Sequence, residues 1–178
     1  MRGMLVFTLL SLSLAACADP TTAGHPTAEG AGTAPEVDER RLDVYTSLIS
    51  ELVGAEPIEW QRVYVVTGLC DDAADPMGPE ACDDSLTRAE RNALRERLDL
   101  EHLRFIDDPA RLYDEEWMQG VPHEIVLRLG PIVERAGKVR VGASFGCGGL
   151  CGGGSTYVLQ ERDGRWSVVG QRGPMWIA

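Results

Sequence analysis

The sequence predicts an α+β domain, in which an antiparallel β-meander carries two helices from the N-terminal half on one face. Three observations lead to this prediction. Apolar residues recur at helical spacing in two early segments. The last third of the chain alternates apolar and polar residues in short stretches that are separated by turn signals. Four cysteines, an even number, lie between residues 70 and 151 and indicate a domain stapled by disulfides.

The two helices are expected in segments with an apolar stripe and capping signals at their starts. The first begins near Glu36 or Asp38 and ends near Gly54, and its apolar face holds Leu42, Tyr45, Leu48, Ile49, Leu52 and Val53. The second follows Thr87, which forms a capping-box pattern with Glu90. Its apolar side is marked by Leu86, Ala89, Leu94 and Leu98.

The strands are expected where β-branched and aromatic residues gather or alternate, at residues 59–67, 102–106, 124–133, 139–143, 156–162 and 166–170. Ala136-Gly137 and Asp163-Gly164 are turn signals, and Asp163-Gly164 is the stronger because Asp and Gly both tolerate positive φ. Residues 107–119 show no clear pattern beyond one helical turn around Leu112, Trp117 and Met118.

The first sixteen residues have the layout of a secretory signal, with Arg2 followed by an apolar run from Met4 to Leu14. This run is shorter than the about 20 apolar residues that a membrane span needs. It closes on Leu14-Ala15-Ala16-Cys17, which resembles the lipobox of bacterial lipoproteins. The resemblance implies cleavage before Cys17, a diacylglyceryl group on its sulfur and a fatty acyl group such as palmitate on the new amine. The alternative is an ordinary secretory signal cut after Ala16, which leaves Cys17 as a free thiol.

Three segments follow from this interpretation: a signal peptide at 1–16, the lipidated cysteine with a disordered tether at 17–36, and one domain at 37–178. The tether is rich in Ala, Thr, Gly and Pro and cannot bury enough apolar surface to offset the entropy of ordering it. It would hold the domain about 25 Å from its anchor. The domain is then expected outside the cytoplasm, on the cell membrane or, as Ala18 favours in a host with two membranes, on the outer membrane.

The charge balance narrows the choice of partners. The formal net charge is -11, and nearly all of the basic residues are arginine. An acidic chain is a poor nucleic-acid binder, because that function needs clustered Lys and Arg. The same charge predicts a soluble domain that does not lie flat on anionic lipid. The expected partners are therefore the bilayer, through acylated Cys17, and an envelope protein or ligand that the sequence does not identify.

The four cysteines after the lipobox are Cys70, Cys82, Cys147 and Cys151. An exported domain favours two disulfides, and we expect the local pairs Cys70–Cys82 and Cys147–Cys151. One alternative is a zinc site of four thiolates, although the Cys-x11-Cys and Cys-x3-Cys spacings are unusual for it. The other alternative is a redox-active Cys147–Cys151 pair, although the flanking glycines indicate a turn and not the helix start that such pairs use.

Two loops are candidate sites. Glycines beside the second cysteine pair would allow a ligand or partner to approach the backbone, and we take Gly148, Gly149, Gly152 and Gly153 as the candidate surface. No lysine follows them as a phosphate-binding loop requires. The loop around the first pair carries six acidic residues: Asp71, Asp72, Asp75, Glu80, Asp83 and Asp84. They could offer oxygen ligands to calcium, but their spacing is not that of an EF-hand, so we interpret the segment as a solvated loop.

No catalytic motif accompanies the two histidines of the domain, His102 and His123, and the adjacent pair Glu115-Glu116 would point its side chains apart. We therefore expect no catalytic residue, no cofactor and no metal, and favour a non-enzymatic interaction or structural domain. The alternatives are an envelope hydrolase or sugar-binding enzyme that uses carboxylates, and a metal-binding or redox module that uses the four cysteines.

The segment from Gly146 to Ala178 resembles the C-terminal part of uncharacterised bacterial lipoproteins and secreted proteins. The shared features are a Cys-Gly-x-x-Cys-Gly-like turn, a strand with a tyrosine, a Gly-x-Trp hairpin and a final Trp-Ile. The resemblance covers about a fifth of the chain. It implies a common fold element and no known activity.

Overall fold

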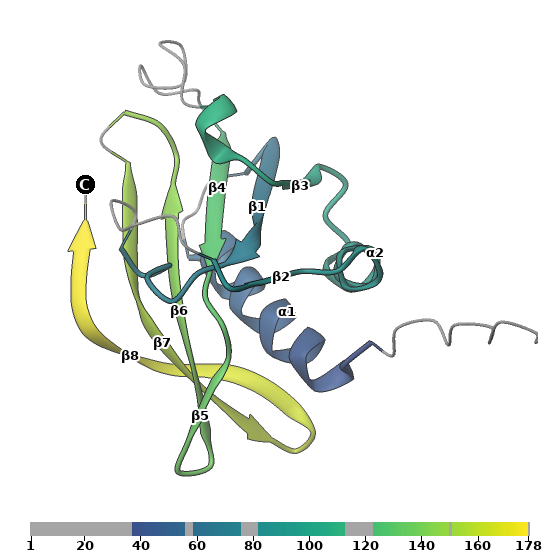
Figure 1. Ribbon diagram of the computed structural model, residues 1–178, viewed down its shortest axis with the longest axis vertical. Coiled ribbons are helices and arrows are strands. Elements are labelled where there is room, and N and C mark those ends of the chain that lie inside the picture. Colours follow the sequence, from purple (N-terminus) through teal and green to yellow (C-terminus); the bar gives the residue numbers. More distant parts are fainter. Residues whose placement is uncertain (1–36, 56–58, 76–81, 113–122, 150, 178) are drawn as a thin grey trace, which may run out of the picture. The chain divides into compact units, whose positions relative to one another are not determined.

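The computed structural model describes residues 37–55, 59–75, 82–112, 123–149 and 151–177 (Figure 1). These residues belong to one compact unit that runs from Pro35 to Ala178. Within them, two α-helices, a mostly antiparallel eight-stranded sheet and two disulfides confirm the α+β class. The expected signal peptide and tether lie outside the described residues. In the described part of the chain, no helix has the length and apolar character needed to cross a bilayer.

Both helices begin at the capping residues that the sequence indicates. In α1, Glu39–Gly54, the Asp38 side chain accepts a hydrogen bond from the Arg41 backbone N–H at 3.1 Å. In α2, Arg88–Leu98, Thr87 and Glu90 form both hydrogen bonds of the capping box, at 3.2 and 2.7 Å. The side chains therefore satisfy backbone donors that have no partner within the helix.

The sheet has the strand order β2-β1-β4-β6-β7-β8, with β3 added beside β1 and β5 beside β6. Consecutive antiparallel pairing joins β4, β6, β7 and β8 (Figure 1). A 3-10 turn, η1, spans Pro109–Leu112. The strands are β1 Arg62–Leu69, β2 Asp84–Ser85, β3 Leu103–Ile106, β4 Glu124–Leu129, β5 Val133–Arg135, β6 Lys138–Gly146, β7 Gly152–Arg162 and β8 Arg165–Ile177.

The expectation of a wholly antiparallel sheet is wrong at β1, which pairs in parallel with both β3 and β4. The reason is the long connection that contains α2, because parallel neighbours require a crossover of this kind. The burial of β1 agrees with this placement, since Val63, Val65 and Leu69 face the main core while Tyr64 and Val66 pack in a smaller cluster. Burial of both faces is typical of parallel strands.

The main core joins residues of both helices to residues of the sheet. Tyr45, Leu48 and Ile49 of α1 and Leu94 of α2 are at most 1% exposed and share one apolar cluster with the sheet. The sheet contributes alternate residues, as the period of two along a strand requires: Val63, Val65, Leu69, Leu103, Ile125, Leu127, Leu129, Val139, Val141, Ala143, Tyr157 and Leu159.

Gly130, immediately after β4, lies where three parts of the chain meet. Its N–H donates to the Gly142 carbonyl at 2.7 Å, and its own carbonyl accepts from the Tyr45 hydroxyl at 3.0 Å. A Cβ at Gly130 would come within 2.9 Å of the Cys70 carbonyl oxygen. Only glycine therefore allows the backbone after β1 to cross this point while β6 and α1 remain bonded to it.

We predict that Gly130→Ala destabilises the domain by about 1–3 kcal/mol, because the added methyl group must displace backbone atoms. Gly170→Ala is the matched control, since a Cβ there meets nothing within 4 Å and its expected effect lies within about 0.5 kcal/mol. Urea unfolding followed by tryptophan fluorescence measures both. Equal stability of the two variants would contradict the close crossing at Gly130.

Stability is also expected to fall at alkaline pH. Burial raises the pKa of Tyr45 above the usual value for tyrosine of about 10. Above that pH the unfolded tyrosine ionises while the folded one stays protonated, so stability is lost as pH rises, with a slope of at most about 1.4 kcal/mol per pH unit. Tyr45→Phe should make this slope shallower in urea titrations between about pH 8 and about pH 11. An unchanged slope would show that Tyr45 ionises as freely in the folded domain as in the unfolded chain.

Candidate functional site

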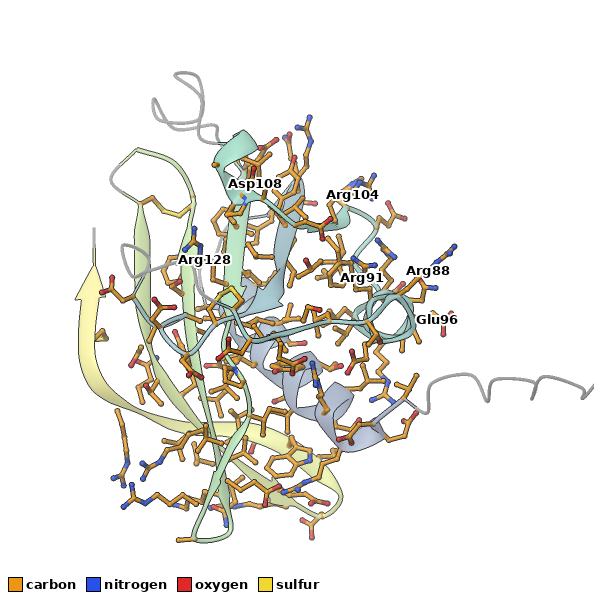
Figure 2. The ribbon with its side chains drawn as sticks, in the orientation of Figure 1. Arg88, Arg91, Glu96, Arg104, Asp108 and Arg128 are labelled. Carbon is orange, nitrogen blue, oxygen red and sulfur yellow. A yellow bond between two sulfur atoms is a disulfide. The ribbon has the colours of Figure 1, made fainter. Side chains whose placement is uncertain are left out.

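The carboxyl ends of β1, β3 and β4 lie at the same edge of the sheet, because these three strands run parallel. In sheets with parallel strands, ligands bind beyond the carboxyl ends. A cavity of about 260 Å³ is found here. Its polar lining consists of Asp107 and Asp108, which follow β3, and Arg128 from β4. Figure 2 labels Asp108 and Arg128. The cavity thus combines one cation with two carboxylates.

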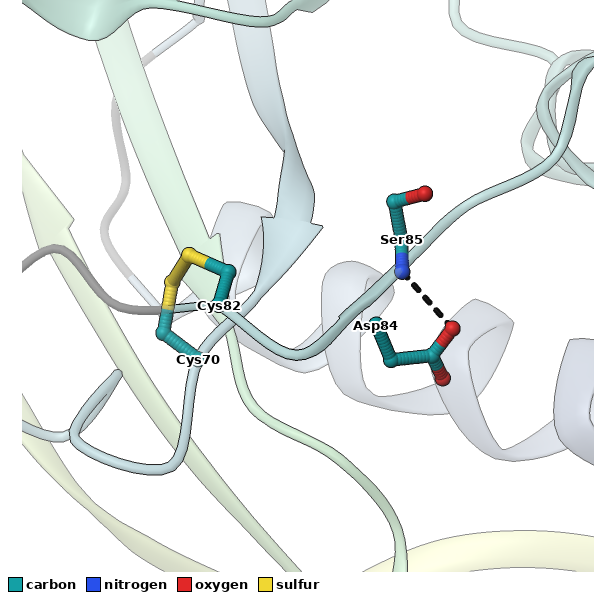
Figure 3. Close-up of a disulfide and its surroundings, with 4 residues drawn as sticks. All are labelled: Cys70, Cys82, Asp84 and Ser85. Carbon is teal, nitrogen blue, oxygen red and sulfur yellow. Dashed lines mark hydrogen bonds between the residues drawn. A yellow bond between two sulfur atoms is a disulfide. The ribbon is translucent and has the colours of Figure 1, made fainter.

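Cys70 and Cys82 line this cavity, and Figure 3 shows the disulfide that joins them. It joins the end of β1 to the segment that leads into β2, where the Ser85 N–H donates to the Asp84 carboxylate at 2.7 Å. Gly68 makes room for it, since a Cβ on Gly68 would lie 3.0 Å from the Cys82 sulfur. This disulfide is the first of the two local pairs that the sequence predicts.

The two carboxylates are already held by protein groups. Asp107 accepts a hydrogen bond from the Thr67 hydroxyl at 2.7 Å and lies 3.8 Å from the Arg91 guanidinium. Asp108 accepts from the Ala110 N–H at 2.9 Å, at the start of η1. Such contacts fix the orientation of a carboxylate. The arrangement suits recognition of a polar group better than proton transfer.

The histidines lie at the other ends of the parallel strands, away from this cavity. His102 and His123 are exposed and precede β3 and β4. Their backbone carbonyls hold the start of β1, where His123 accepts from the Gln61 and Arg62 N–H groups at 2.7 and 3.2 Å. The structure does not bring either side chain to a carboxylate of the cavity. Glu115 and Glu116 lie outside the described residues.

The glycine-rich segment forms a disulfide-closed hairpin between β6 and β7, and Cys147–Cys151 is the second predicted local pair. Gly148 and Gly149 have φ of 83° and 57°, which explains the need for glycine in this turn. Gly152 and Gly153 begin β7, and both are buried in the sheet. Of the four candidate glycines, Gly149 is the one exposed to solvent.

The acidic loop lies partly against the sheet. The Asp71 carbonyl and Ala74 approach Gly142 of β6, while Asp83 and Asp84 are exposed beside the first disulfide. Glu80 lies outside the described residues. Among those that are described, no group of three or more His, Cys, Asp and Glu side chains has the geometry of a metal site. The four domain cysteines form disulfides and thus offer no thiolates to zinc.

A larger open groove of about 690 Å³ separates α1 from the start of β8. One stripe of α1 lines it with polar side chains at helical spacing: Asp43, Thr46, Ser47, Ser50 and Glu51. The Ser47 hydroxyl donates to the Trp166 carbonyl at 3.0 Å and so joins the two walls. Asp43 is paired with Arg97 of α2.

Neither a protein-family model, nor a curated protein, nor a solved structure matches this chain. The site therefore has to be interpreted from its own geometry. Sequence reasoning missed Asp107, Asp108 and Arg128 because it placed β1 in an antiparallel sheet. The signal in the sequence was Asp107-Asp108-Pro109, which directly follows an expected strand. It could not be interpreted as a site from the sequence, because polar residues at the ends of two strands come together only when those strands are parallel neighbours.

Removal of each disulfide should lower stability by different amounts. We expect about 3 kcal/mol for Cys70→Ala/Cys82→Ala and about 2 kcal/mol for Cys147→Ala/Cys151→Ala, because the first bond closes 12 residues and the second 4. Urea unfolding of both double variants against the oxidised parent tests this. If neither variant loses stability, these bonds do not constrain the folded protein.

Proposed function

We propose that this chain is a membrane-anchored lipoprotein with its domain outside the cytoplasm, and that the domain acts by binding and not by catalysis. The observation that carries the proposal is the pairing of four domain cysteines in two disulfides. Such bonds persist in oxidising compartments beyond the cytoplasm. Residues 14–17, which resemble a lipobox, would supply the matching export signal, with the lipid on Cys17.

Binding is favoured over catalysis by the groups that line the cavity. Its carboxylates accept hydrogen bonds from Thr67 and a backbone N–H, and its cysteines are oxidised. Its volume of about 260 Å³ falls below the about 300–1,000 Å³ of typical small-molecule sites. A cavity of this size suits one side chain or polar head group of a partner. Asp107 and Asp108 would recognise its donors, and Arg128 would face its acceptors.

The carboxylate-hydrolase alternative has less support. The groove between α1 and β8 offers Asp43 and Glu51, but eight residues along a helix separate them by about 12 Å. Glycosidases hold their two carboxyl groups within about 9.5 Å of each other. Asp43 also forms an ion pair with Arg97, which leaves Glu51 as the remaining carboxylate of the stripe. The redox and zinc alternatives are weakened by the disulfides.

The anchor is tested by Cys17→Ser. The parent should take up labelled fatty acid and stay with the membrane fraction through a high-salt wash, because acyl chains hold it by the hydrophobic effect. The variant should take up no label. Ala18→Gly, which keeps the cysteine, is the matched control and should behave as the parent. Fatty-acid labelling that persists in Cys17→Ser would contradict the proposed anchor.

A further inference from the structure

Basic side chains gather on the sheet face that points away from the helices, near the turns of the β5–β6 and β7–β8 hairpins. The strand register places them there. Val139, Leu159 and Val168 pair across the strands and face the core, so residues one position along each strand face outward. These outward positions carry five cations near the turns, Arg135, Lys138, Arg140, Arg162 and Arg165, and a sixth, Arg172, pairs with outward-facing Thr156 farther along β8; the six are here called the basic face.

The basic face is not neutralised by its own protein. Within the described part of the chain, none of its six side chains forms an ion pair, whereas Arg40, Arg41, Arg62, Arg91 and Arg97 all do. Two cross-strand pairs even place like charges opposite each other, Arg162 with Arg165 and Arg135 with Lys138. Such pairs destabilise a sheet. Because these pairs lower the stability of the sheet, we infer that the charges have a function other than stabilising the fold.

The acidic residues of the same strands avoid this face. Glu134 and Glu161 pair with Val139 and Trp166, so both point to the helix side, and Glu134 forms an ion pair with Arg40. Asp163 occupies the hairpin turn. The carboxylates of these strands are therefore kept off the basic face, while the segment around Asp71 approaches the same sheet face at Gly142. Because charges are screened beyond about 8–10 Å at physiological ionic strength, a partner near the hairpin turns, away from Gly142, would sense mainly these cations.

The basic face also lies at the end of the domain where the described chain begins. At the start of α1, Arg40 pairs with Glu134 of β5 and lies over the Trp166 ring of β8, 5.3 Å from its centroid. Both hairpins turn at this end (Figure 1). The first described residues of the domain therefore lie at the same end as the basic face. A tether of about 25 Å would keep the face within reach of the bilayer that holds the lipid.

We propose that the basic face docks on the anionic phospholipid headgroups of the bilayer to which Cys17 is anchored. This inference rests on the proposed anchor for its geometry. Phosphate groups match the arginine-rich composition of the face, since guanidinium binds phosphate with two hydrogen bonds. Val133, opposite Arg140 and 53% exposed, adds an apolar contact to the same surface. Docking orients the domain, so that the side opposite the hairpins points away from the membrane.

The test uses the chain from residue 17 onward with Cys17→Ser, so that docking is measured without the lipid and without the apolar run of residues 4–14. Flotation with vesicles of equal parts phosphatidylglycerol and phosphatidylcholine is compared with flotation on phosphatidylcholine alone. We expect binding to the anionic vesicles that weakens as sodium chloride is added. Arg140→Gln/Arg162→Gln/Arg165→Gln should weaken it on the order of 100-fold, since each basic residue near an anionic surface contributes about fivefold.

The matched control removes three arginines from α2 and β3 in the variant Arg88→Gln/Arg95→Gln/Arg104→Gln. It changes the net charge by the same amount, and its flotation should stay within about twofold of the parent. Equal loss in both triple variants, or binding that ignores the anionic lipid, would overturn the proposal. So would binding to a soluble anionic polymer without binding to vesicles. Each of these results leaves the anchor standing, because fatty-acid labelling of Cys17 is measured separately.

Discussion

The close approach at Gly130 is the contact on which the rest of the domain depends. Its N–H and carbonyl join β6 and α1, while the Cys70 carbonyl passes at a distance that leaves no room for a side chain. This crossing leads the chain from the central strand β1 into the disulfide-closed segment. Within that segment Asp71 and Ala74 approach the sheet at Gly142, and the two cysteines line the cavity beside Arg128. The core, the cavity and the first disulfide therefore share one geometric constraint.

Much of this fold follows from local signals in the sequence. Capping residues locate both helices, period-two burial identifies the strands of the last third, and short cysteine spacings predict both disulfides. The parallel pairing of β1 could not be read in this way, because it depends on which strands become neighbours after α2. Asp107, Asp108 and Arg128 were missed for the same reason. They come from two strands and become one site only through that pairing.

The distribution of charge over the surface also cannot be predicted from the composition of the chain. A net charge of -11 predicts a domain that is repelled by anionic lipid, and this holds for an average over the surface. The strand register separates the charges, so that the cations of β5 to β8 share one face and Glu134 and Glu161 point to the other. The domain thus has two distinct features, a basic face near the end where α1 begins and a cavity lined by carboxylates. Together they support the proposal of a binding domain that the membrane orients.

The most direct test of this account is peptide mapping under non-reducing conditions of the native protein extracted from its membrane. The account predicts a diacylated N-terminal Cys17 peptide, the linked pairs Cys70–Cys82 and Cys147–Cys151, and no bound metal. Free thiols at these four positions together with bound zinc would contradict it. Such a result would make the cysteines a metal centre and remove the main support for an exported binding domain.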